Sequence, residues 1–349
     1  MTTERSNNLM SKVVSSSNLD AAYAHVRASR KNRHYNDLFW SLPHWPNLKH
    51  SLRHKLQSGD YHFSPVKQIR LEDEWFSDWY PEDAIVLKAL ELVLTPLFCD
   101  HYDFSDVSHV KGHGGLKRGV RDAFNYSKNY TRVIKTDIAS YYDSMDHKIL
   151  HQYLCKTILD TRVQDLLWQV LDRIHVYQGN HRQVKDKGIP RGCSLSPLFG
   201  AIYLNTLDTW SKQNNVAYVR YMDDFVIFVK GRRTIRRLIK ELYSLLNKLG
   251  LKLADQKTFI GRTAKGFNFL GYRLSPKGIT MAQSTLDKMV TRYRRRYAKG
   301  ASQSHLTAYL KRWIQWAKSG VSLNVEKLNL TIQSVLTNSC HVAVSLTKY

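Results

Sequence analysis

The chain has 349 residues, of which 43% are hydrophobic and 23% charged, a composition that excludes an intrinsically disordered protein and suffices for two or three packed subdomains. Lysine and arginine number 53 against 29 aspartate and glutamate, so the formal net charge is +24, which favours a polyanionic partner. Nucleic acid is the leading class of partner on charge alone, and an anionic membrane surface is the alternative.

Cysteine spacing and hydropathy bear on the compartment. The four cysteines (Cys99, Cys155, Cys193 and Cys340) lie far apart, with neither zinc-ligand nor redox spacing, so we expect reduced, buried thiols in a cytoplasmic protein. The serine-rich N-terminus lacks the apolar segment of a signal peptide, and residues 1–18 are predicted to be disordered. No apolar run reaches the roughly 18 residues that a membrane span needs, so no membrane partner is expected.

The ordered elements follow from periodicity and turn residues. Helical patterns are predicted for residues 19–56, with a break near two prolines, for residues 81–98, and for the basic stretch after the glycines of HVKGHGG. RVIKTDIASYYDSMD begins as a strand and becomes a helix, and LDTRVQDLLWQVLDRIHV is a further helix. A Gly/Pro-rich loop, KDKGIPRGCSLSPL, leads into the next helix.

The C-terminal half alternates strands and helices. VAYVRYMDDFVIFVK predicts two short strands around a two-residue turn, followed by a helix that stops near Gly250 and then a strand. GFNFLGYRLSPKGITMA predicts a hairpin, and the chain is helical and basic from residue 285 onward.

Two adjacent carboxylates, Asp223 and Asp224, interrupt an otherwise apolar run. An ordinary exposed turn is one interpretation of them. The other involves Asp137, which ends an apolar strand that can lie beside the hairpin, so that the carboxylates meet at one edge of a sheet. Clustered carboxylates repel one another, and divalent cations such as Mg²⁺ relieve that repulsion. For Asp137 alone, a helix N-cap is the alternative.

Four motifs in order, DIASYY, GIPRGCSLSP, YMDDF and FNFLGY, resemble the motif series of reverse transcriptases, most closely the bacterial group II intron, retron and defence-associated types. The resemblance extends from about Tyr61 to Tyr272. It implies an α+β right-hand polymerase with helical fingers, a palm of antiparallel sheet plus helices, and a helical thumb. The fingers would take residues 19–130 and 175–199, the palm residues 131–174 and 200–275, and the helical thumb and C-terminal segment residues 276–349.

The resemblance also implies catalytic roles. Asp137 and Asp223 would bridge two Mg²⁺ ions, for which Mn²⁺ can substitute. Asp224 would lie near the metal, and the backbone carbonyl of Ile138 would face it. Lys257 would be the lysine that protonates pyrophosphate, and the alternative is an ordinary lysine beside a strand.

Three residues are implied in nucleotide selection. Tyr142, five residues after Asp137, matches the family's sugar gate, so dNTP substrates are expected. The alternative is that Tyr142 is a core aromatic and Tyr141 is exposed. Arg191 stands where the family usually has glutamine, which leaves substrate preference and standard templating open, and Gly192 would let the backbone approach the nascent base pair.

Other contacts are assigned by position along the motif series. Lys67 and Arg70 are the candidates for holding the triphosphate, although the EWFSDWYPED segment departs from the family's Arg-Pro-Leu stretch. The primer grip would be Phe269, Leu270, Gly271 and Tyr272, with a plain buried hairpin as the alternative. Contacts to the nucleic-acid backbone are predicted for Lys111, Lys117, Arg118, Arg121, Arg292, Arg295, Arg296, Lys311 and Arg312, with a solvated helical face as the alternative.

These features predict an RNA-directed DNA polymerase that joins dNTPs to a primer 3′-hydroxyl, with an RNA template and a DNA product. The expected type is a specialised bacterial enzyme that uses a dedicated noncoding RNA, with phage defence as its role. An intron-type retroelement reverse transcriptase and a catalytically silent RNA-binding scaffold are the alternatives. The sequence shows no nuclease motif, so a nuclease step would need a second protein.

Overall fold

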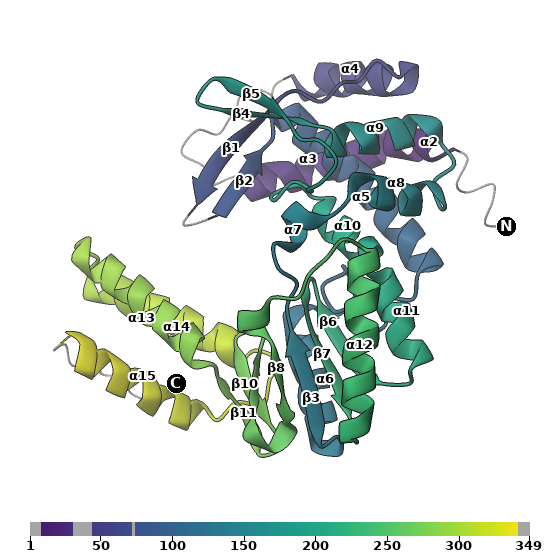
Figure 1. The fold of residues 1–349 in the computed structure, drawn as a ribbon. Helices are drawn as coiled ribbons and strands as arrows, with labels where there is room; N and C mark the ends of the chain where they lie inside the picture. The colour runs from purple at the N-terminus through teal and green to yellow at the C-terminus, as the bar shows by residue number, and fades with distance from the viewer. Residues whose placement is uncertain (1–7, 31–43, 72–73, 341–349) are drawn as a thin grey trace. The chain divides into compact units, whose positions relative to one another are not determined.

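The structure is a computed structural model, and it describes residues 8–30, 44–71 and 74–340. The chain divides into two compact units (Figure 1). The first unit takes Met1–Phe104, Ile138–Thr209 and Tyr243–Lys252, and the second takes Ser105–Asp137, Trp210–Leu242 and Leu253–Tyr349. Each unit combines helices with mainly antiparallel sheets, which confirms the predicted α+β class.

The start of the described chain is helical, so the prediction of disorder for residues 1–18 is wrong from residue 8 onward. Helix α2 (Leu9–Val13) and helix α3 (Ser16–Arg30) follow one another directly, and α2 buries Leu9, Met10 and Val13. The amphipathic spacing of these apolar residues outweighs the serine-rich composition on which the prediction depended. Residues 1–7 lie outside the described part of the chain.

Helices make up most of the first unit. Helix α5 (Pro81–His101) begins with proline and two acidic residues in its first turn, as predicted, and packs against α3. The other helices of this unit are α4 (Trp45–Ser58), α7 (Tyr141–Ser144), α8 (His147–Cys155), α9 (Thr161–Leu171) and α10 (Ser196–Tyr203). Two further helices, α11 (Asn205–Gln213) and α12 (Arg232–Lys248), contribute residues to both units.

A four-stranded sheet completes the first unit, in the order β2-β1-β4-β5. Its strands are β1 (Val66–Leu71), β2 (Glu74–Asp78), β4 (Ile174–Tyr177) and β5 (Asn180–Gln183). The helix predicted through Val176 ends at Leu171 in the structure, and the β4–β5 hairpin that follows it was not predicted. The hairpin turn, Gln178-Gly179, has φ values of +48° and +81°, the geometry that two-residue hairpins favour. The region predicted as helical fingers therefore also contains a sheet.

The second unit contains an antiparallel sheet in the order β6-β7-β3-β8. Its strands are β3 (Arg132–Thr136), β6 (Ala217–Tyr221), β7 (Asp224–Val229) and β8 (Phe259–Arg262), and the 3-10 turn η1 (Asp255–Lys257) precedes β8. Side chains alternate between the two faces, so Val226 and Phe228 share one face, on which helix α6 (Gly115–Asn129) packs. As predicted, the strand that carries Asp137 at its end lies beside the hairpin.

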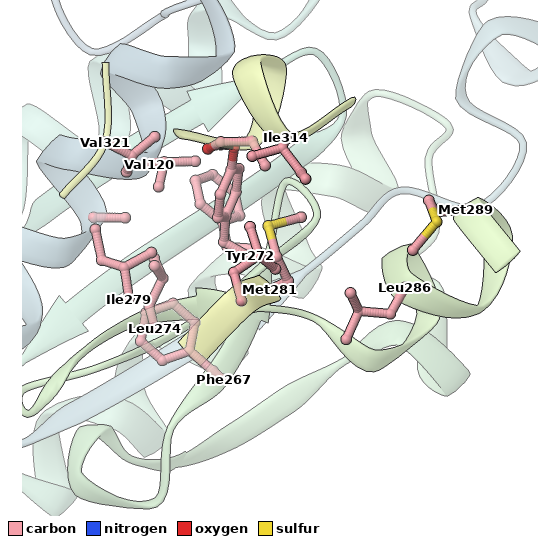
Figure 2. Close-up of a cluster of buried hydrophobic side chains, with 14 of the residues drawn as sticks. Val120, Phe267, Tyr272, Leu274, Ile279, Met281, Leu286, Met289, Ile314 and Val321 are labelled. Atoms are coloured by element: carbon pink, nitrogen blue, oxygen red, sulfur yellow. Dashed lines mark hydrogen bonds between the residues drawn. The ribbon is translucent and has the colours of Figure 1, made fainter. Parts of the chain in front are cut away.

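A second sheet and three helices extend this core. The sheet is formed by β9 (Phe267–Phe269), β10 (Tyr272–Ser275) and β11 (Gly278–Met281), after the 3-10 turn η2 (Thr263–Lys265). The helices are α13 (Gln283–Ala298), α14 (Gln303–Lys318) and α15 (Val325–Cys340). Figure 2 shows how Tyr272 and Met281 of the sheet meet Val120 of α6 and Ile314 of α14 in one buried cluster.

This core allows a first prediction on stability. Phe228 is fully buried, and its ring centre lies 5.7 Å from that of Phe267 and 5.8 Å from that of Tyr126. Because close-packed neighbours collapse only partly around a cavity, Phe228→Ala is expected to lower the free energy of unfolding by about 3–5 kcal/mol in urea denaturation. The control is Tyr297→Ala on α13, at a residue that is 52% exposed, with an expected change within about 0.5 kcal/mol. A loss for Phe228→Ala as small as the control's would contradict this packing.

Two expectations about the compartment can be compared with the structure. Among the described residues, no helix combines the length and the apolar character needed to cross a membrane. Cys193 is buried and free, as expected, whereas Cys99 and Cys155 are free but only partly buried. The Cys340 side chain lies outside the described part. Fingers, palm and thumb are defined by their functions in a polymerase, so the assignment of residues to them stays a prediction.

Candidate active site

The paired aspartates lie at a tight hairpin turn. Tyr221 of β6 pairs with Asp224 of β7, which leaves Met222 and Asp223 as the two central residues of the turn. Met222 has a φ of +58°, at the turn position where two-residue hairpins of this kind favour glycine. Both aspartates are partly buried, which excludes the ordinary exposed turn. The predicted two-residue turn is confirmed, with Asp224 as the first residue of β7.

Asp137 lies beside this turn because β3 pairs with β7. Thr136, the last residue of β3, stands opposite Phe225, so the next residue reaches the level of the aspartates. The Asp137 side chain is buried, and its carboxyl group shares a hydrogen bond with that of Asp223. The N-cap alternative is excluded, because the residue that precedes the following helix, α7, is Ser140. The structure therefore brings together the carboxylates that the sequence predicted to meet.

Two lysines compensate these acids. Lys135 of β3 and Asp224 of β7 lie diagonally on one face of adjacent strands, with Nζ 3.0 Å from Oδ1. The Lys257 ammonium, from η1, donates to Oδ2 of Asp137. Thr136 and Thr258 join their hydroxyl groups at 2.7 Å and so hold the η1 segment along the end of β3. The carboxylate cluster is thus partly neutralised by the protein itself.

The three carboxyl groups titrate differently. Burial raises the pKa of Asp223 to about 7, and the hydrogen bond with Asp137 and its charge act in the same direction. Burial also raises the pKa of Asp224 to about 6, although Lys135 opposes it. Burial acts to raise the pKa of Asp137 as well, but hydrogen bonds with Asp223 and Lys257 outweigh it and lower that pKa. The Asp137–Asp223 pair therefore gains or loses a proton near neutral pH, and a bound cation would take the place of that proton.

The donor set suits a hard divalent cation. Oδ1 of Asp137 is buried and has no hydrogen-bond partner among the described residues, and carboxylate oxygen is the ligand that Mg²⁺ prefers. Across residues 8–30, 44–71 and 74–340, no group of three or more His, Cys, Asp and Glu side chains is arranged to hold a metal ion. Mg²⁺ commonly takes only one or two protein carboxylates and completes its shell with substrate phosphates and water. Asp137 and Asp223 fit that requirement, and metal binding stays a prediction.

Metal binding should therefore depend on pH. A carboxyl whose pKa is raised on folding contributes stability that is full below the unfolded value of 3.8 and lost as the pH rises through the folded value, about 6 for Asp224 and about 7 for Asp223. Between about pH 5.5 and about pH 8 this contribution to stability falls, because the two carboxyl groups lose their protons. At the higher pH a cation therefore binds without having to displace protons. We expect Mg²⁺ to raise the melting temperature more at the higher pH. Equal shifts at both pH values would contradict this site, and Asp223→Asn is the control that should abolish the difference.

Tyr142 and Arg191, predicted to contact the nucleotide, lie together within the first unit. Nη2 of Arg191 lies 3.1 Å from Oδ2 of Asp143, and the guanidinium carbon lies 5.9 Å from the centre of the Tyr142 ring. Tyr141 is the core aromatic, with its hydroxyl donating to the carbonyl of Gly200 at 2.7 Å, whereas Tyr142 is partly exposed. This excludes the alternative in which the two tyrosines exchange places.

Packing against strand β2 explains why residue 192 is a glycine. Its φ is +88°, and a Cβ there would lie 3.0 Å from the carbonyl oxygen of Ser77 in β2. The Ser77 N–H in turn donates to the carbonyl of Arg191 at 2.8 Å. The close backbone approach expected of this glycine is thus made to β2, and an approach to a nascent base pair stays a prediction.

Lys67 and Arg70, the two residues predicted to hold the triphosphate, lie on opposite faces of their sheet. Lys67 and Arg70 are both exposed, but they are three residues apart in β1 and therefore point to opposite faces of the sheet. Lys67 lines a cavity of about 530 Å³ together with Tyr80, Tyr177 and His181. A nucleotide bound on one face of this sheet would meet only one of the two cations.

The primer-grip prediction is narrowed by burial. Phe269 and Tyr272 lie in the core, at 1% and 0% exposure, so a primer cannot reach them. Leu270 and Gly271 form the two-residue turn between them, with φ values of +49° and +84°. The N–H of Leu270 donates to the Asp224 carboxylate, so this turn lies beside the aspartates. Contact of the Leu270-Gly271 turn with a primer stays a prediction.

Two basic residues predicted to contact nucleic acid bond to the protein instead. Lys117 donates to the carbonyls of Trp316 and Ala317 at the end of α14 and to the hydroxyl of Tyr272, and burial lowers its pKa to about 8. Arg121 donates to the carbonyl of Gly320 at 2.8 Å. These two residues therefore cap the C-terminal end of α14.

The remaining predicted contacts keep exposed positions. Arg118 donates to the carbonyls of Ser105 and His113 and pairs with Asp122, while Lys111 is exposed. In the C-terminal helices, exposed or partly exposed positions are taken by Arg292, Arg295, Arg296, Lys311 and Arg312. Arg296 covers the ring of Tyr309 at 4.4 Å. Backbone binding by these residues stays a prediction.

Three residues at the turn were not predicted, namely Lys135, Arg220 and His109. Lys135 and Arg220 stand inside apolar strands, and a charged residue in such a run is a signal that sequence analysis can use. His109, whose Nδ1 accepts the N–H of Met222, comes from a loop and carries no comparable signal.

Comparison with known proteins identifies the family to which the chain belongs. Residues 83–274, more than half of the chain and including all three aspartates, match the family model of reverse transcriptase (RNA-dependent DNA polymerase). Protein YkfC of Escherichia coli strain K12 is 29% identical over 278 residues, which cover 65% of this chain and 71% of YkfC. The group II intron-encoded protein LtrA of Lactococcus lactis subsp. cremoris is 24% identical over 293 residues, which cover 62% of this chain and 48% of LtrA.

The chain thus spans about half the length of LtrA. Among solved structures, apo telomerase from Candida tropicalis aligns with 68% of this chain and 60% of its own, with 13% identity and a TM-score of 0.49. The motif series and the family match agree, and the chain belongs to the reverse transcriptase (RNA-dependent DNA polymerase) family.

Proposed function

We propose that this protein is an RNA-directed DNA polymerase that joins dNTPs to a primer 3′-hydroxyl along an RNA template. The Asp137–Asp223 pair carries the proposal: two carboxyl groups share a hydrogen bond where an apolar strand ends beside a strained turn. Such a pair is unfavourable for stability alone, because two ionised carboxylates within hydrogen-bonding reach repel each other unless one of them takes up a proton. It suits phosphoryl transfer, in which cations and substrate phosphates occupy the same place.

Each residue of the cluster has a proposed task. Asp137 and Asp223 would hold two Mg²⁺ ions, or Mn²⁺ in their place, with Asp224 and the carbonyl of Ile138 beside them. When bound, the ions supply charge stabilisation for the attacking 3′-oxygen and the departing pyrophosphate. Contact with Asp137 raises the pKa of Lys257, so this lysine is protonated at neutral pH and can donate a proton to pyrophosphate.

Nucleotide selection is proposed for residues of the first unit. Tyr142 would act as the sugar gate, and its partly exposed ring supports that role. Arg191 lies over the same ring and pairs with Asp143, so its position is coupled to the gate. An arginine here would add a permanent positive charge beside the nucleotide.

A primer-extension assay tests the proposed function. Purified protein would be given a DNA primer on an RNA template, Mg²⁺ and the four dNTPs. We expect a DNA product that ends at the template 5′ end and disappears when EDTA removes the metal. Tight binding of the same duplex without extension in Mg²⁺ or Mn²⁺ would instead favour the silent RNA-binding scaffold.

We further propose that the enzyme is a specialised bacterial type that works in the cytoplasm with a dedicated noncoding RNA, in phage defence. Arg191 and the divergent EWFSDWYPED segment support specialisation, and the net charge of +24 supports a stable RNA partner. An intron-type retroelement enzyme is the second candidate, which the similarity to LtrA favours. Sequencing of the copurifying RNA separates them: one discrete structured RNA supports the first, and intron RNA supports the second. A second protein, such as a nuclease, would copurify if the programme requires one.

A further inference from the structure

The backbone of the catalytic turn is held from two sides at its strained residue. Met222 has a φ of +58°, which is unfavourable for a residue with a Cβ atom. Its N–H donates to Nδ1 of His109 at 2.9 Å, and its carbonyl oxygen accepts from Nη1 of Arg220 at 3.0 Å. The peptide groups on both sides of the strained residue are therefore bonded, immediately before Asp223.

His109 reaches the turn because the segment before α6 pairs with an edge strand. Strand β6 lies at the edge of its sheet, and its Arg220 N–H donates to the carbonyl of Asp106 at 3.0 Å. The Ser108 N–H donates to the carbonyl of Arg220 at 2.9 Å, and Val107 forms a parallel bridge with Arg220. This pairing brings the next residue, His109, to the level of the turn.

The two bonding groups are packed against neighbouring residues. Helix α6 closes on the segment at Gly119, where a Cβ would lie 2.8 Å from Oγ of Ser108. The His109 ring meets the Tyr221 ring at an angle of 67°, with ring centres 5.8 Å apart. Arg220 is fully buried, so its charged donor acts in a place from which water is excluded.

We propose that His109 and Arg220 are positioning residues that hold Met222 in its strained conformation and thereby aim Asp223 at Asp137. Both bond to the backbone of Met222, so they act on the position of Asp223 through the residue that precedes it. The proposal rests on the proposed function, because the aim of Asp223 matters for rate only if the pair performs the chemistry. Misplacing a catalytic group by about 1 Å can lower a rate by about 100-fold.

Amide variants of His109 separate positioning from simple stability. In His109→Asn the side-chain oxygen can take the place of Nδ1, whereas in His109→Gln it lies one carbon farther out. His109→Leu removes the acceptor altogether. The matched control is His113→Asn in the same loop, at a residue to which no part of the reaction is assigned. The readouts are the rate of single-nucleotide addition at saturating dNTP, the Kd for primer–template and the urea midpoint.

We expect His109→Gln and His109→Leu to lose about 10- to 100-fold in rate with an unchanged Kd, and His109→Asn and the control to stay within about threefold of wild type. If His109→Leu fails to fold, the Asn and Gln pair decides. Equal rates for Asn and Gln, or a wild-type rate for Leu, would overturn the inference while the wild type still synthesises DNA. A wild type that synthesises nothing would overturn the proposed function and the inference with it.

Discussion

Asp223→Asn is expected to abolish DNA synthesis, with a loss of at least about 10³-fold in the rate of nucleotide addition. Asparagine keeps the size of the side chain, but it removes the carboxyl group that shares a hydrogen bond with Asp137 and that would hold a cation. Since Asp223 lies at a turn and not in the core, the fold and RNA binding should persist. The measurement is primer extension together with an RNA-binding titration on the same preparation.

The control for this variant is Asp255→Asn. Asp255 is an exposed aspartate in η1, two residues before Lys257, and no catalytic role is assigned to it. The Asp255→Asn variant loses the same charge from the same unit as Asp223→Asn. Because Asp255 has no assigned role in the reaction, the activity of this variant should stay within about twofold of wild type. Retention of synthesis by Asp223→Asn would refute the carboxylate site, and an equal loss in both variants would show that net charge alone is responsible.

Tyr142→Val is expected to raise incorporation of ribonucleotides relative to deoxyribonucleotides by about 100-fold. The smaller side chain would leave room for the 2′-hydroxyl, the group that distinguishes the two sugars. The structure permits this role because Tyr142 is partly exposed and Tyr141 is the buried aromatic. The measurement is the ratio of kcat/KM for each nucleotide pair on one RNA template.

Tyr141→Phe is the matched control for the gate. It removes only the hydroxyl that donates to the carbonyl of Gly200, which should lower the free energy of unfolding by about 1 kcal/mol. Sugar selectivity should not change. Equal use of both nucleotide types by the wild type would exclude Tyr142 as a gate, whatever the variants do.

The elements that hold the carboxylates could be predicted because local patterns determine them. The apolar strands around Asp223 and Asp224 leave few residues for the turn, and β3 ends at Asp137 where its apolar run ends. Antiparallel pairing then brings strand end and turn to one edge. Local pattern, register and motif order gave the same answer.

Tertiary packing decided what the sequence could not. Phe269 and Tyr272 belong to the motif matched to the primer grip, but cross-strand pairing and the helices α13 to α15 bury both. Lys117 and Arg121 lie in a basic stretch, and only the packing of α6 near the end of α14 shows that they bond to carbonyls there. Strand β5 of the missed hairpin is exposed and polar throughout, so it lacks the apolar alternation that would reveal a strand.

The central claim is that this site adds nucleotides as an RNA template directs. The most direct measurement is single-nucleotide addition to a DNA primer opposite each of four defined RNA template bases, with the dNTPs supplied one at a time. We predict that the complementary dNTP is added at least about 100-fold faster than the others. Equal addition of all four, or no addition in the presence of Mg²⁺ or Mn²⁺, would contradict the account.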